Sequence, residues 1–236
     1  MSEHRAAPVI DDVYPSPQWS PIDVDRAAML VIDLQQLCAG PGRGMFARAA
    51  ELGAPELLEP YGRRLESTVL PNVAALLASF RAAEAPVVFT RIESLLPDGS
   101  DRSGCHVRLG LHVPPGATDA EILEEVSPVP GEVIVSKTTS DAFIGTGLER
   151  VLRNVGADQL VVGGVLTNEC VESTVRHAAD LGFEVALVED ACGAVESSLH
   201  EATVRTLGHT YARITSTAEV VAEVKGEGDR PGTARG

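Results

Sequence analysis

The sequence predicts an α/β fold, a doubly wound and mostly parallel six-stranded sheet with helices on both faces. Its strand-like segments are short, continuously apolar and β-branched, which is typical of parallel strands covered on both sides. They alternate with segments of helical periodicity, as successive βα units do. At 236 residues and 44% hydrophobic, the chain is long enough to bury one full core. The predicted strands are 27–34, 86–92, 132–137, 158–165, 184–190 and 212–215.

The segments between these strands carry the spacing of amphipathic helices. Apolar residues in 73–80 recur at i, i+3, i+4 and i+7, and Pro71 suits the first turn of that helix. The same spacing recurs over 148–155 and 171–181. A glycine follows each of these two segments, and glycine commonly ends a helix. The pattern therefore predicts helices that connect the parallel strands.

The two ends and one internal segment do not follow this pattern. Residues 1–25 are rich in proline and aspartate and are predicted to form an N-terminal arm, which could bring Trp19 to a pocket. A single domain is expected over 26–222, and 223–236 has the composition of a disordered tail. The segment 93–131 is long and rich in proline and glycine. Loops of this size inside a compact domain are commonly functional.

Composition restricts the possible partners and location. The formal net charge of −15 argues against nucleic acid, which requires basic patches. No apolar stretch has the length of a membrane span, and the first residues lack the apolar core of a signal peptide, so a cytoplasmic protein is expected. The four cysteines form no CxxC pair and are predicted to be free thiols.

Three polar residues stand at the carboxyl ends of predicted strands, where open α/β sheets bind their ligands. They are Asp33, Lys137 and Cys170. A carboxylate can take the proton of a thiol, and a nearby ammonium or helix N-terminus favours the thiolate. Each residue also has a structural interpretation: Asp33 as a helix cap, Lys137 as a solvated strand end and Cys170 as an inert core thiol. Three such residues at one edge favour nucleophilic chemistry.

Several motifs resemble the isochorismatase-like cysteine hydrolases, which include N-carbamoylsarcosine amidase, biuret and ureidoacrylate amidohydrolases and nicotinamidase. The resemblance rests on VIDLQ (31–35), SKTTSDAF (136–143) and GGVLTNECVESTVRHAADLGFEVALVEDACGA (163–194). It implies a Rossmann-like domain, an Asp33, Lys137 and Cys170 triad, and catalysis through a thioester without metal or organic cofactor. It also implies a non-proline cis peptide between Val165 and Leu166. The backbone amides of Leu166 and Cys170 would then form the oxyanion hole.

Four further residues are candidates for the substrate site. Gln35 lies two residues after Asp33 and could touch the triad, whereas Phe143 closes the SKTTSDAF motif. Thr167 is expected to support the turn before Cys170. Arg43, in the glycine-rich GPGRG insertion, could reach a substrate carbonyl or remain an exposed loop charge.

The sequence therefore predicts a cysteine amidohydrolase acting on a small amide, ureide or lactam, assembled as a homodimer or homotetramer. An isochorismatase-type vinyl-ether hydrolase and a non-catalytic thiol-bearing binding protein are the alternatives. Cys170 argues against the vinyl-ether enzyme, and the complete triad argues against a binding protein. His106 and His112 do not form the Asp-x-His-x-His metal site that nicotinamidases carry.

Overall fold

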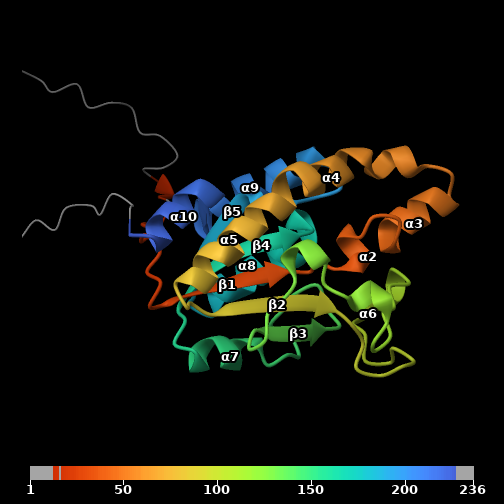
Figure 1. Ribbon diagram of the computed structural model, residues 1–236, viewed down its shortest axis with the longest axis horizontal. Coiled ribbons are helices and arrows are strands. Elements are labelled where there is room, and N and C mark those ends of the chain that lie inside the picture. Colours follow the sequence, from red (N-terminus) through yellow and green to blue (C-terminus); the bar gives the residue numbers. More distant parts are fainter. Residues whose placement is uncertain (1–12, 16, 227–236) are drawn as a thin grey trace, which may run out of the picture.

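The computed structural model describes residues 13–15 and 17–226 and confirms the α/β fold (Figure 1). Six parallel strands form one sheet in the order β3-β2-β1-β4-β5-β6. The strands are β1 (Ala27–Ile32), β2 (Val87–Ile92), β3 (Val133–Lys137), β4 (Gln159–Val165), β5 (Glu184–Gly193) and β6 (Arg213–Thr215). Each predicted strand is present, within a few residues of its expected bounds.

Burial explains why these runs become central strands. Every residue of β1 and β4 is buried, so their continuous apolar sequences face helices on both sides. The edge strand β3 is less protected, and Ile134 is partly exposed. Strand order reverses between β1 and β4, which pair directly. A reversal of this kind opens a crevice at the carboxyl ends of the strands. Asp33 and Cys170 follow these two strands.

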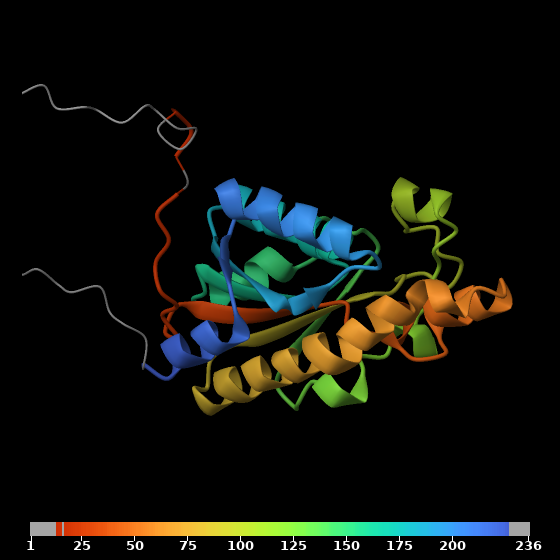
Figure 2. The same ribbon diagram turned by 90° about the horizontal axis from the view of Figure 1, so that it is seen from above.

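Helices cover both faces of the sheet (Figure 2). One layer contains α5 and α10, and the other contains α7, α8 and α9. The larger helices are α3 (Gly44–Glu51), α4 (Glu59–Arg64), α5 (Leu70–Ala82), α7 (Leu148–Asn154), α8 (Glu172–Asp180), α9 (Ser197–Thr210) and α10 (Thr217–Val224). Two short helices, α2 (Gln36–Ala39) and α6 (Gly104–Arg108), lie beyond the carboxyl edge of the sheet. None of the helices in 13–15 and 17–226 is long and apolar enough to cross a bilayer.

The predicted helices are present, with one difference in extent. Pro71 does lie in the first turn of α5, but the helix continues from α4 through a π-helical stretch, Leu65–Val69. Proline lacks the N–H that a continuous α-helix would use, and the wider π turns precede it directly. The sequence therefore predicts the start of α5 but not its continuation from α4.

The described part of the arm packs at the amino ends of the strands. The amide of Ser20 donates to Glu184 Oε1 at 2.6 Å, and the amide of Ile22 donates to Glu223 Oε2 at 2.9 Å. Trp19 therefore lies at the edge opposite Asp33 and Cys170, and within one chain it does not join them. The expected tail begins inside α10, and its remaining residues, 227–236, lie outside the described residues, as do 1–12 and 16.

Candidate active site

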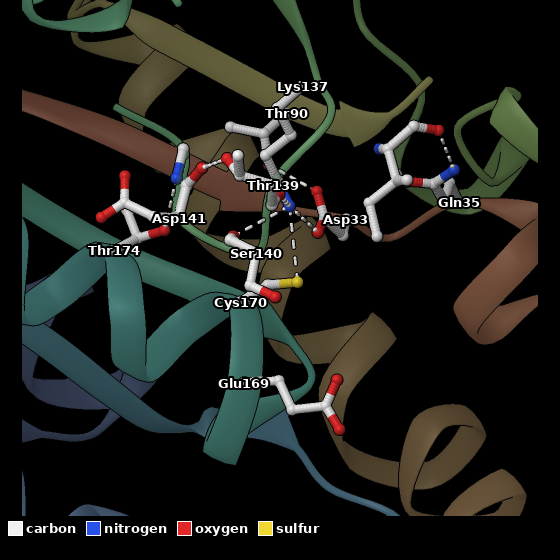
Figure 3. A network of polar contacts seen from close by, with 12 residues as sticks. Asp33, Gln35, Thr90, Lys137, Thr139, Ser140, Asp141, Glu169, Cys170 and Thr174 are labelled. Carbon is white, nitrogen blue, oxygen red and sulfur yellow. Dashed lines mark hydrogen bonds and ion pairs between the residues drawn. The ribbon is translucent and has the colours of Figure 1, made fainter. Parts of the chain in front are cut away.

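The fold brings together the three polar residues from the strand ends (Figure 3). Lys137 Nζ lies 2.7 Å from Asp33 Oδ2 and 3.4 Å from Cys170 Sγ. The ammonium thus bridges the carboxylate and the thiol. Asp33, Lys137 and Cys170 are all buried, at 0, 1 and 4% exposure. A fully buried charged pair beside a thiol is costly to desolvate, so its presence points to chemistry rather than to stability.

Asp33 is held by its own backbone and by the neighbouring strand. Its φ of 51° lies in the left-handed region, which aspartate tolerates better than most residues, and β1 ends just before it. Thr90 Oγ1 donates to Asp33 Oδ1 at 2.7 Å from β2. One carboxylate oxygen is therefore fixed by a hydroxyl, and the other faces Lys137.

Lys137 is fixed by the loop that follows β3. Its ammonium donates to the carbonyls of Thr139 at 2.9 Å and Ser140 at 3.0 Å. Asp141 shapes this loop, because Oδ1 accepts from the amide of Phe143 and Oδ2 lies 2.7 Å from His177 Nδ1 on α8. The carbonyl cradle leaves the ammonium directed at Asp33 and Cys170.

The charges of the cluster set the protonation of its members. Burial alone would lower the pKa of Lys137, but Asp33 and Cys170 outweigh it and raise that pKa, so the ammonium stays charged. Burial and then the charge of Asp33 raise the pKa of Cys170, although Lys137 opposes them. The sequence predicts a favoured thiolate at this position. In the structure, burial and the adjacent carboxylate oppose that thiolate and favour the thiol.

The turn that carries Cys170 depends on a glycine in β4. Gly164 has a φ of +130°, and a Cβ there would lie 2.1 Å from the carbonyl oxygen of Ile32. Close packing against β1 thus requires Gly164, whereas a Cβ at Gly163 would lie 3.2 Å from the Cβ of Ala191 on β5. The Val165–Leu166 peptide is cis. A π-helical stretch, Thr167–Val171, then leads into α8, and the carbonyl of Leu166 accepts from the amides of Glu169 and Val171.

The other candidate residues lie apart from the triad. Gln35 binds backbone instead: its Nε2 donates to the carbonyls of Ile92 and Asp119, and its Oε1 accepts from the amide of Ile92, with the side chain directed away from Cys170 (Figure 3). Phe143 is buried against Phe183 and His177, with ring centroids 5.9 and 5.3 Å apart. Arg43 is exposed before α3, beside a polar hollow that it shares with Asp119.

Thr167 contacts a residue that the sequence analysis does not single out. Its Oγ1 lies 2.9 Å from Nδ1 of His200, on α9. Both side chains are buried. Thr90 is likewise absent from the expected site, although a threonine inside the buried run VVFTRI is a polar residue within a strand and could have indicated it. His200 gives no comparable signal, because it stands in an ordinary amphipathic helix.

A groove of about 550 Å³ lies next to the turn that carries Cys170. The triad does not line it directly. Its lining includes Cys105, Leu109, Ser140, Asn168, Glu169 and Arg176. The long 93–131 segment thus returns to the site through α6. His106, on the same short helix, is buried, and burial together with the charge of Lys137 lowers its pKa. Across 13–15 and 17–226, His, Cys, Asp and Glu form no group of three or more suited to a metal ion.

Comparison with known proteins places this geometry in a family. Residues 27–219 match the isochorismatase domain model. Nicotinamidase 3 of Arabidopsis thaliana is 36% identical over 61% of this chain and 73% of its own. Ureidoacrylate amidohydrolase RutB of Variovorax paradoxus is 26% identical over 75% of each chain. A cysteine hydrolase structure from Pseudomonas syringae superposes with a TM-score of 0.77 at 24% identity, covering 90% of this chain and 98% of that one, which establishes the fold. The chain belongs to the isochorismatase family of hydrolases.

Proposed function

We propose that this protein is a cysteine-dependent amidohydrolase that cleaves a C–N bond of a small amide, ureide or lactam through a thioester. The single observation that carries the proposal is the bridging position of Lys137 Nζ, 2.7 Å from Asp33 and 3.4 Å from Cys170 in a buried site. Relatives named as a nicotinamidase and a ureidoacrylate amidohydrolase support the same class of reaction.

The proposed course begins with a neutral thiol. Asp33 takes the proton from Cys170 as Sγ attacks the substrate carbonyl carbon, which forms the C–S bond. The resulting oxyanion binds the backbone amides of Leu166 and Cys170, and each such donor lowers the barrier by about 3 kcal/mol. Asp33 then gives its proton to the leaving nitrogen as the C–N bond breaks. Water, deprotonated by Asp33, hydrolyses the thioester and restores the thiol.

Charge balance supports this assignment of roles. Before attack, the buried cluster holds one ammonium and one carboxylate. After proton transfer and attack it holds one ammonium and one substrate oxyanion, so the net charge of the site stays at zero. A low-polarity site strongly favours reactions that keep its net charge constant. Lys137 therefore stabilises both states without donating its own proton, consistent with its raised pKa.

The surroundings favour neutral or cationic substrates. The chain carries a formal charge of −15, and the groove beside the turn is lined by Glu169 in addition to the ion pair of Glu172 with Arg176. An anionic substrate would meet repulsion there.

We also propose a homo-oligomer, because Leu95, Leu96 and Leu109 expose apolar side chains on the 93–111 segment, at 69, 48 and 67% exposure.

The direct test measures ammonia release from biuret, N-carbamoyl amino acids and ureidoacrylate-like compounds, and ring opening of lactams by mass spectrometry, because a hydrolysed lactam keeps its nitrogen in the product. We expect the kcat for the active substrate to fall at least about 10⁴-fold in Cys170→Ala, because the nucleophile is removed. Cys192→Ala is the matched control, because Cys192 is also a buried thiol whose pKa burial raises, to about 12. Unchanged turnover of the active substrate by Cys170→Ala would overturn the proposal. Vinyl-ether cleavage that survives this substitution would favour the isochorismatase-type alternative.

A further inference from the structure

A buried polar chain that the proposed mechanism does not use leads to the turn before Cys170. Thr167 Oγ1 lies 2.9 Å from His200 Nδ1, and His200 Nε2 lies 3.0 Å from Arg64 Nη2. Thr167 and His200 are buried, at 0 and 7% exposure. The chain therefore joins three elements: the π turn of the nucleophile, α9 and the end of α4.

The direction of these hydrogen bonds follows from the chemistry of the partners. A guanidinium only donates, so Nε2 of His200 must accept from Arg64 and carries no proton. The ring is then neutral with its proton on Nδ1, which donates to Thr167 Oγ1. Burial and then the charge of Arg64 lower the pKa of His200 to about 4, in agreement with a neutral ring. The tautomer and the orientation of the ring are thus fixed.

Arg64 is itself held in place by the backbone of β5. Its Nε donates to the carbonyl of Cys192 at 2.9 Å, and its Nη2 donates to the carbonyl of Glu189 at 3.1 Å. The anchor is therefore a strand of the central sheet, adjacent to β4. The hydrogen bonds through His200 therefore fix the position of Thr167 relative to this strand.

Thr167 stands between the two residues whose amides would bind the oxyanion, Leu166 and Cys170. A side chain fixed at this point restricts the backbone on both sides of it. We propose that His200 is a positioning residue of the hydrolase: its Nδ1–H holds Thr167 so that the Leu166 and Cys170 amides converge on the oxyanion. This inference rests on the proposed function.

Two substitutions separate the donor and acceptor roles of the ring. His200→Asn keeps an N–H near the position of Nδ1 and loses the acceptor for Arg64. His200→Gln keeps an acceptor near the position of Nε2 and loses the donor to Thr167. We expect His200→Gln to lower kcat about 10- to 100-fold with KM within about threefold, the cost of misplacing groups that act in the transition state. His200→Asn should keep kcat within about threefold of the wild type.

Further measurements separate positioning from mere stability. Thr167→Val should reproduce the kcat loss of His200→Gln, and the double variant should lose no more than either single variant, because one hydrogen bond is removed in all three. His209→Gln, on the same helix, should retain wild-type kcat. The ¹⁵N shifts of His200 at pH 7 should report a neutral ring with a protonated Nδ1, a readout that needs no substrate.

The outcomes are distinct. Full kcat in His200→Gln, equal kcat losses in His200→Asn and His200→Gln, or a protonated Nε2 would overturn the inference. If Cys170→Ala abolishes turnover in the same assay, such a result leaves the proposed function standing. If Cys170→Ala retains turnover, the proposed function itself fails.

Discussion

The amino ends and the carboxyl ends of the strands, here called the amino edge and the carboxyl edge of the sheet, each carry an ion pair of the same length. The two ion pairs differ in their access to water. At the amino edge, Arg213 Nη2 lies 2.7 Å from Glu223 Oε2, with each side chain 17% exposed. At the carboxyl edge, Lys137 Nζ lies 2.7 Å from Asp33 Oδ2, with both side chains at 0%. The amino-edge pair also binds the backbone of the N-terminal arm, through Ser20 and Ile22.

This difference separates a structural cluster from the cluster that we propose to be reactive. The amino-edge pair stays partly hydrated and fastens one segment to another. The carboxyl-edge pair loses all hydration, and Asp33 Oδ2 makes no hydrogen bond of regular geometry beyond its ion pair. An oxygen in that position is available to accept a proton. A buried charge without full hydrogen bonding contributes little to the stability of a fold, and it is typical of groups that take part in chemistry.

Removal of the buried cation should have the largest effect. Lys137→Met leaves Asp33 charged and unpaired, so we expect a loss of about 3–5 kcal/mol in the free energy of unfolding and of nearly all activity. Arg213→Met, at the amino edge, should cost about 1 kcal/mol and leave kcat unchanged. Urea unfolding and steady-state kinetics on both variants provide the measurement. Equal costs at the two edges would remove the distinction between them.

The next effect concerns the hydroxyl on Asp33. Thr90→Val removes the 2.7 Å bond to Oδ1, and we expect a loss of about 1–3 kcal/mol in stability together with a lower kcat, because the carboxylate is no longer held in one orientation. Thr215→Val is the matched control, because Thr215 is also a buried strand threonine that donates to a carboxylate, Glu219, at 2.9 Å. It should lose stability only. A kcat of Thr90→Val equal to that of the wild type would show that the bond does not orient the base.

A smaller effect should appear in the pH dependence of stability. His200 has a pKa of about 4 in the folded chain, against about 6.5 when unfolded. The unfolded state binds the proton more readily. The contribution of the neutral His200 ring to the free energy of unfolding is therefore fully present above about pH 6.5, and it is lost as the pH falls from 6.5 towards 4. Between pH 7 and pH 5 this amounts to about 2 kcal/mol. Urea unfolding at the two pH values should show a smaller loss in His200→Asn, and equal losses would contradict the assigned pKa.

Much of this fold was predictable from sequence because its strands are buried on both faces. Continuously apolar segments such as β1 and β4 indicate strands that are covered on both faces. The positions of Asp33, Lys137 and Cys170 then follow from where the predicted strands end. Their meeting depends on strand order, which the family resemblance implies. The continuation of α4 into α5 was not predictable, since Pro71 indicates a helix start.

The supporting residues were less accessible to sequence reasoning. Gln35 has the spacing of a triad neighbour, yet its amide binds the backbone of Ile92 and Asp119, because Asp33 adopts a positive φ and the chain is no longer extended there. His200 lies 33 residues beyond Thr167, and only tertiary packing brings them together. Burial and the charge of Asp33 also raise the pKa of the Cys170 thiol, where the sequence pattern predicts a lowered one.

The most direct measurement of the central claim is the trapping of the acyl-enzyme. The enzyme is mixed with the amide that it turns over, quenched in acid within one turnover, and analysed by intact mass and peptide mapping. The buried Asp33, Lys137 and Cys170 cluster predicts an acyl adduct on the peptide that contains Cys170, formed in the wild type and absent from Cys170→Ala. Turnover of the same amide without any adduct, or an adduct on Cys38, Cys105 or Cys192 alone, would contradict it.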